Sequence, residues 1–191
     1  TISPGGGAAR TISGSVAAGS LIRLNGAQNV TINGLNTGGN TLTISNTSIS
    51  SSANTATITL TNGASNNTIT NCTLLGSSTG TAGTASPQTG TIFINANGVA
   101  CNNNIISNNN IGDVSGFFPS IAIAGLGSNS SVVNTGNSIT GNNIYDWYSD
   151  NGSAAINIGS FNSGWTIDQN RCYQTASRSG MGIGSYFRFI Y

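Results

Sequence analysis

The stretch "NNNIISNNNIGD", residues 102–113, combines six asparagines with three isoleucines. Asparagine is depleted in β-strands and enriched in tight turns, whereas isoleucine is enriched in strands. The mixture therefore predicts very short strands separated by corners in which asparagine side chains bond to the backbone. Much of the chain repeats this pattern, and the repeat indicates the fold.

A six-residue pattern recurs along the chain at intervals of 25 to 37 residues. In each copy an apolar residue is followed by two residues, an asparagine or small residue, one further residue and a second apolar residue. The five copies are residues 44–49, 69–74, 106–111, 139–144 and 167–172. Self-similarity at such a period is typical of solenoids.

A second pattern of alternating apolar residues precedes each copy, at residues 30–33, 57–60, 91–94, 120–123 and 155–158. Both patterns are too short for helices and have the two-residue period of strands. Equivalent strands of successive coils then pair in parallel, about 4.8 Å apart. We predict an all-β chain, with residues 1–191 forming a single right-handed parallel β-helix domain of about six to seven coils.

Stacked coils place equivalent residues in columns, and three apolar columns are expected to fill the interior. We predict that the first column is Ile44, Ile69, Ile106, Ile139 and Ile167, the second Ile49, Leu74, Ile111, Ile144 and Cys172, and the third Ile32, Ile58, Ile92, Ile121 and Ile156. Between the first two columns lies a more polar one, formed by Thr47, Cys72, Asn109, Asn142 and Asn170.

On these repeats, nearly the whole chain resembles the pectin-lyase-like β-helix superfamily, and in particular β-helix segments of secreted bacterial surface proteins. The resemblance implies that Asn109, Asn142 and Asn170 form the asparagine ladder of the superfamily, in which each amide bonds the turn backbone and the next asparagine. It also implies an extracellular or cell-surface location. The chain starts and stops without an obvious cap, so we expect it to be a fragment of a longer β-helix or a subunit that stacks head-to-tail.

Composition narrows the possible partners. Only 5% of the residues are charged, the net charge is +1, and the chain contains no Lys, Glu or His. Without a basic patch, nucleic acid is not an expected partner. No apolar run reaches membrane-spanning length, so no membrane span is expected. Other copies of the chain, or flanking β-helix segments at the open ends, are expected partners, with glycans as candidate ligands.

Two groups of residues are candidate sites. Tyr145, Trp147, Tyr148 and Tyr173 are rings suited to stacking on sugars, although they would equally serve to cover the edge of a coil. Asp113 and Asp146 each follow an interior isoleucine by two residues, so they are expected on adjacent coils. Two close carboxylates suit Ca²⁺, the one cofactor we consider; loops that diverge would instead leave both in water.

These features favour a non-catalytic structural or adhesive β-solenoid that presents aromatic loops to glycans. The first alternative is a polysaccharide-active lyase or hydrolase of the same superfamily, for which Asp168 and Arg171 are a minimal acid and base set; we expect these two to form an ion pair instead. The second alternative is an ice-binding solenoid, suggested by "TITLT" at 57–61 but disfavoured by coils of unequal length. The three cysteines, Cys72, Cys101 and Cys172, are expected to be buried and free of disulfides.

Overall fold

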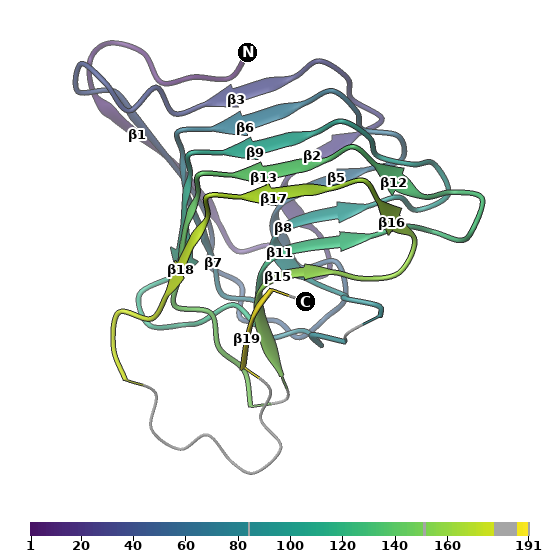
Figure 1. The fold of residues 1–191 in the computed structure, drawn as a ribbon. Coiled ribbons are helices and arrows are strands. Elements are labelled where there is room, and N and C mark those ends of the chain that lie inside the picture. Colours follow the sequence, from purple (N-terminus) through teal and green to yellow (C-terminus); the bar gives the residue numbers. More distant parts are fainter. Residues whose placement is uncertain (84, 151, 178–186, 191) are drawn as a thin grey trace.

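The structure is a computed structural model that describes residues 1–83, 85–150, 152–177 and the backbone of 187–190. Three parallel sheets, which we name A, B and C, surround one interior (Figure 1). Each turn of the chain passes through sheet C, then sheet A, then sheet B. No helix occurs in the described residues. The all-β parallel solenoid predicted from the repeats is therefore confirmed.

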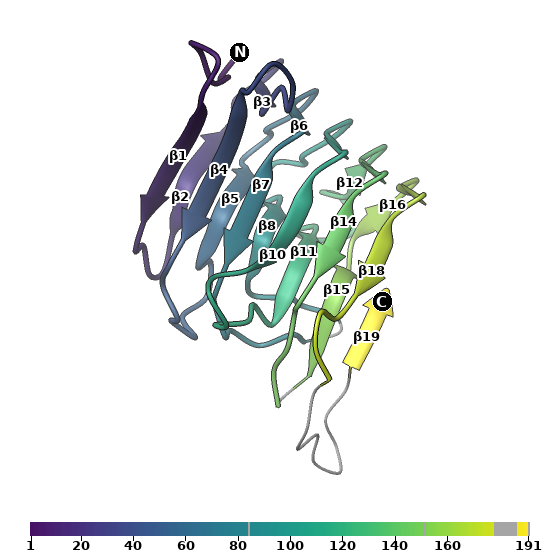
Figure 2. The ribbon, with the colours of Figure 1, turned by 90° about the vertical axis from the view of Figure 1, so that its left-hand side faces the viewer.

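The strands of each sheet come from successive turns. Sheet A contains β3 (Thr31–Asn33), β6 (Thr68–Thr70), β9 (Ile105–Ser107), β13 (Ser138–Thr140) and β17 (Thr166–Asp168). Sheet B, which faces the viewer in Figure 2, contains β1 (Ala9–Gly14), β4 (Thr41–Asn46), β7 (Thr73–Gly76), β10 (Asn110–Asp113), β14 (Asn143–Tyr145) and β18 (Arg171–Tyr173). Sheet C contains β2 (Ser20–Asn25), β5 (Ala56–Thr61), β8 (Gly90–Asn95), β11 (Ile121–Leu126), β15 (Ser153–Ile158) and β19 (Phe187–Ile190). A short pair, β12 (Asn134–Thr135) and β16 (Asn162–Ser163), joins sheets C and A in two turns.

The solenoid has fewer turns than predicted. Sheet A, which every complete turn crosses, holds five strands in the described part of the chain, against the six to seven coils expected. Near the start of the chain, β1 of sheet B pairs directly with β4, and β2 of sheet C pairs directly with β5.

Three apolar columns fill the interior, as predicted, but their membership needs correction at the ends of the repeat. The observed columns are Ile32, Ile69, Ile106, Ile139 and Ile167 in sheet A; Ile44, Leu74, Ile111, Ile144 and Cys172 in sheet B; and Ile22, Ile58, Ile92, Ile123 and Ile156 in sheet C. Thirteen of the fifteen predicted positions lie in an interior column, although Ile44 and Ile32 each belong to a different column from the one assigned.

Two residues that were predicted to lie in the interior columns lie outside them. Ile49 lies beyond the end of β4 and is 58% exposed, because residues 44–49 cross the end of one strand instead of spanning two. Ile121 pairs with Ala154 at the start of β11, two residues before the interior position that Ile123 occupies. Ile121 packs on the outer side of sheet C, in a separate apolar cluster with Phe93 and Ala124.

The outer face of sheet C is itself covered. Residues 77–83 and 85–89, here called the covering loop, follow β7 and pass along this face. Ala82 packs into the cluster that contains Phe93, the Ser120 hydroxyl donates to the Gly80 carbonyl, and the Ser160 amide donates to the Ala85 carbonyl over 2.8 Å. Sheet C is thus buried on both sides over β8 and β11, and its residues there alternate between two apolar layers instead of between core and water.

The corner between sheets A and B contains the predicted asparagine ladder. The Asn109 amide donates to Asn142 Oδ1 over 3.1 Å, and the Asn142 amide donates to Asn170 Oδ1 over 2.9 Å. Each amide also donates to a carbonyl of the preceding turn, so the buried corner leaves few polar groups unpaired. Cys72 continues the column without joining the ladder, since its backbone amide donates to Asn109 Oδ1. Thr47 was placed wrongly in this column: it follows the end of β4, where its amide donates to the Gly14 carbonyl.

A second ladder, not predicted, supports the corner between sheets C and A. The Asn67 amide donates to Asn104 Oδ1, and the Asn104 amide donates to Asn137 Oδ1, each over 3.0 Å. In both ladders most asparagines follow a residue with positive φ, such as Asn66 (φ 59°) before Asn67 or Asn108 (φ 55°) before Asn109. Asparagine tolerates this left-handed conformation, which explains why the corners contain Asn-Asn pairs.

Candidate functional site

Tyr145 and Tyr173 stack on the outer face of sheet B. They are partners in the register of β14 and β18, with ring centroids 5.9 Å apart and ring planes inclined by 29°. Both side chains are half-buried, on the side of the sheet opposite Ile144 and Cys172. The two rings stack because equivalent residues of adjacent turns lie one rung apart.

The position of Tyr145 depends on a glycine in the previous turn. In the register of β10 and β14, Gly112 lies opposite Tyr145, and a Cβ at Gly112 would overlap the Tyr145 ring. The ring therefore lies directly over the backbone of β10. The flat packing of a ring on glycine holds Tyr145 against the sheet and leaves Tyr173 as its neighbour in the next turn.

Arg171 completes a cluster on this face. Its guanidinium carbon lies 4.7 Å from the centroid of the Tyr173 ring, within the range of a cation–π contact. Arg171 precedes Tyr173 by two residues in β18, so both side chains project from the same side of the strand. We call Tyr145, Arg171 and Tyr173 the tyrosine–arginine patch.

Asp113 and Asp146 lie beside this patch. Burial raises the pKa of the Tyr145 hydroxyl, and the negative charges of Asp113 and Asp146, together with Tyr173, raise it further. Each carboxylate already accepts hydrogen bonds from the chain: Asp113 from the Gly116 amide, and Asp146 from the amide and hydroxyl of Thr175. Within the described residues no group of three or more His, Cys, Asp or Glu could hold a metal ion. Ca²⁺ between the two aspartates stays a prediction.

The two other aromatic candidates do not join the patch. Trp147 is 0% exposed and packs in the interior cluster, so its expected role as an exposed sugar platform is wrong. The chain turns inward after Asp146, whose φ of 53° redirects the backbone away from the line of β14. Tyr148 is half-buried, contacts Phe118 edge-to-face at 6.4 Å and donates to Asp150.

The ion pair expected between Asp168 and Arg171 does not form. Asp168 accepts hydrogen bonds from the amide and the side chain of Gln169, while Arg171 lies over Tyr173. Asp168 ends β17 of sheet A, and Arg171 starts β18 of sheet B. As predicted, the three cysteines are free: Cys72 and Cys101 are buried and Cys172 is half-buried.

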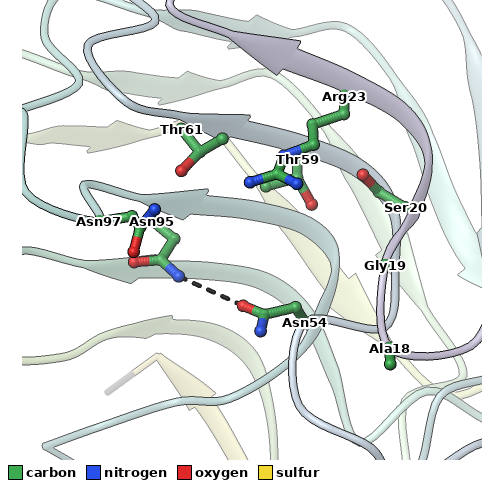
Figure 3. Close-up of a pocket in the computed structure, with 9 residues that line it drawn as sticks. All are labelled: Ala18, Gly19, Ser20, Arg23, Asn54, Thr59, Thr61, Asn95 and Asn97. Carbon is green, nitrogen blue, oxygen red and sulfur yellow. Dashed lines mark hydrogen bonds between the residues drawn. The ribbon is translucent and has the colours of Figure 1, made fainter.

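A polar groove on the opposite part of the molecule was missed from the sequence. It has a volume of about 120 Å³ and lies on the outer side of β2, β5 and β8, beside the region covered by the covering loop. Figure 3 shows its lining residues, which are Ala18, Gly19, Ser20, Arg23, Asn54, Thr59, Thr61, Asn95 and Asn97. The one signal in the sequence was Arg23, a charged residue within the otherwise apolar "LIRL" at 21–24.

The outer face of sheet A carries two ranks of small polar side chains, the feature relevant to ice binding. The unequal coil lengths lie in loops outside this sheet, where every strand has three residues. However, Asn33, Ile105 and Asp168 occupy outward positions and interrupt the hydroxyl array. The outer face of sheet A therefore lacks the regular array of hydroxyl groups that ice binding requires.

Comparisons with known proteins add no identification: we found no matching family model, no similar curated protein and no similar solved structure. The parallel β-solenoid is therefore defined by its own structure, and the likeness to the pectin-lyase-like superfamily stays a resemblance. Among the residues described, no helix is long and apolar enough to cross a membrane.

Proposed function

We propose that this chain is a non-catalytic, extracellular β-solenoid that binds glycans through the tyrosine–arginine patch. The observation that carries the proposal is the packing of Tyr145, Tyr173 and Arg171 on one outward face. Half-exposed tyrosine combines an apolar ring with a hydroxyl that forms hydrogen bonds, and this is the combination that a sugar requires. The guanidinium adds donors directed outward from the same strand.

The surroundings of the patch favour binding over catalysis. A glycosidase needs two carboxyl groups that are free to exchange protons or attack the sugar. Here Asp113 is bonded within its own turn, and Asp146 is 5% exposed and bonded to Thr175. Both carboxylates therefore serve to hold loops beside the patch. The solenoid contributes a rigid surface, since two asparagine ladders and three apolar columns fix each turn against the next.

A glycan array tests the proposal. The wild type is compared with Tyr173→Ala and Arg171→Ala, and with Tyr148→Ala as the matched control, because that ring contacts Phe118 and lies outside the patch. We expect wild-type binding to at least one neutral or acidic glycan, weakened about 10-fold or more by either patch substitution. Tyr148→Ala should bind as the wild type does. Absence of wild-type binding, or equal losses in all three variants, would overturn the proposal.

A further inference from the structure

The groove around Arg23 lies in a part of the chain that carries positive charge alone. The four acidic residues are Asp113, Asp146, Asp150 and Asp168, so residues 1–112 contain no carboxylate side chain, while Arg10 and Arg23 lie within them. Arg23 is exposed on the outer side of β2, and no acidic residue lines the groove. In the part of the chain that the structure describes, its guanidinium is thus a cation with no counter-charge beside it, in a protein that has very few charges.

The groove around it is built from hydrogen-bonding side chains. Arg23 is paired with Thr59 in the register of β2 and β5, and Thr61 is paired with Asn95 in the register of β5 and β8. Figure 3 shows the Arg23 side chain extending over β5 beside Thr59, with Asn54 and Asn95 on the other side of the groove. Three successive turns therefore contribute polar groups to one concave surface.

Two hydroxyl groups in this groove have no hydrogen-bond partner among the described residues. Thr59 is 6% exposed, and its Oγ1 is buried without a hydrogen bond; the Oγ of Ser20 is also buried without one. Buried hydroxyls are normally satisfied, and an unsatisfied one costs about 1–3 kcal/mol in general. Two such hydroxyls beside the guanidinium of Arg23 mark a place where donors converge and where no acceptor from the described part of the chain meets them.

We propose that the groove binds the acidic group, a carboxylate or a sulfate, of an anionic polysaccharide. The planar guanidinium of Arg23 matches two oxygens of such a group, and the hydroxyls of Thr59 and Ser20 donate to an oxygen that reaches the groove floor. Asn54, Asn95 and Asn97 lie at the sides, where they meet the hydroxyls of the same sugar. The saccharide nature of the ligand rests on the function proposed above, whereas the oxyanion follows from the groove alone.

The test is isothermal titration calorimetry at low salt with three polymers and one free ion. Dextran sulfate and alginate present sulfate and carboxylate groups, unmodified dextran is the neutral backbone of the first, and inorganic sulfate is the free oxyanion. The variants are Arg23→Gln and Thr59→Val. The control is Arg10→Gln, which removes the same charge from an exposed arginine of β1 whose guanidinium donates to the Ala9 carbonyl. Circular dichroism confirms that each variant is folded.

We expect Arg23→Gln to weaken binding of dextran sulfate or alginate about 10-fold or more, and Thr59→Val to weaken it about 3-fold or more. Arg10→Gln should have little effect, and dextran should not use the groove. Equal losses for Arg23→Gln and Arg10→Gln would show diffuse electrostatic attraction and overturn the proposal. Binding of inorganic sulfate without either polymer would overturn the saccharide assignment. Neutral glycans that depend on Tyr173 but not Arg23 report on the patch, so the two proposals fail separately.

Discussion

The side-chain amide of Asn104 donates to Oδ1 of Asn137, one turn further along the solenoid, over 3.0 Å, and both residues are 1% exposed. Asn104 also donates to the Ala64 carbonyl and accepts bonds from the amide groups of Asn67. One side chain therefore satisfies polar groups in three successive turns. Its removal would leave several of them buried without partners.

We accordingly expect Asn104→Ala to lower the free energy of unfolding by about 2–4 kcal/mol. Urea denaturation followed by circular dichroism measures the change. Asn25→Ala is the control, since Asn25 is exposed on β2 and accepts one bond from Asn62, and its loss should cost no more than about 0.5 kcal/mol. Similar costs for the two variants would mean that the inner ladder does not stabilise the corner.

Gly112 is a position where a single methyl group should matter. Its Cβ would overlap the ring of Tyr145, so Gly112→Ala must displace either the ring or β10. We expect a loss of about 1–3 kcal/mol and weaker glycan binding at the tyrosine–arginine patch. Thermal unfolding and the glycan array measure the two effects. Gly5→Ala is the control, because no atom lies within 4 Å of its Cβ position, and an equal effect there would contradict the packing argument.

Substitution of Trp147 should mainly lower the stability of the fold, whereas substitution of Tyr173 should mainly lower glycan affinity. Trp147 is 0% exposed, so Trp147→Ala leaves a large cavity and should cost about 3–5 kcal/mol. At a temperature where the variant remains folded, its glycan affinity should match that of the wild type. Tyr173→Ala should lose affinity at a smaller cost in stability. Denaturation and titration on both variants check this, and weaker binding by folded Trp147→Ala would place that ring in the site after all.

The Cys72 thiol should make the free energy of unfolding depend on pH in the alkaline range. Burial raises the pKa of its thiol from 9.0 to about 11, opposed by a smaller effect of the Gly34 backbone. Because the folded-state pKa is the higher one, the protonated thiol contributes stability that is complete below about pH 9 and is lost as the pH rises through about 11. The free energy of unfolding should fall across this window, and Cys72→Ala should make the fall smaller.

The same thiol should be protected from alkylation. At pH 8 in the native protein, iodoacetamide should label half-buried Cys172 before Cys72, and urea should make the two rates similar. Mass spectrometry of the labelled peptides measures this order. Rapid native labelling of Cys72 would mean that the interior column beside it opens readily.

The repeats were enough to predict the fold and the middle of each column, since Ile69, Ile106 and Ile139 recur with the same neighbours. They failed for Ile49 because one six-residue pattern fits both a strand–corner–strand unit and a strand followed by a loop. They failed for Ile121 because residues 120–123 contain two isoleucines, and Ile123 is the one that takes the interior position. A shift of one residue in a short strand moves a side chain between core and surface. Only the pairing of whole strands resolves that ambiguity.

The candidate sites show a similar division. The stack of Tyr145 and Tyr173 followed from equal positions in adjacent turns, whereas the burial of Trp147 did not, because it depends on the backbone turn at Asp146. The Arg23 groove was missed for another reason: Arg23, Thr59 and Asn95 share no local motif. They converge because three turns of sheet C stack and the covering loop leaves that part of the sheet open.

The covering loop also bears on how the molecule comes apart. In many solenoids each repeat contacts its immediate neighbours alone, so unfolding can proceed from one end, turn by turn. Here the Asn157 amide donates to the Gly83 carbonyl, a contact between residues 74 positions apart that links the segment before β8 to β15, two strands away in the sheet. Such a strap joins several turns into one cooperative unit. Backbone amides of β8, β11 and β15 should therefore exchange their hydrogens through a shared opening rather than in sequence.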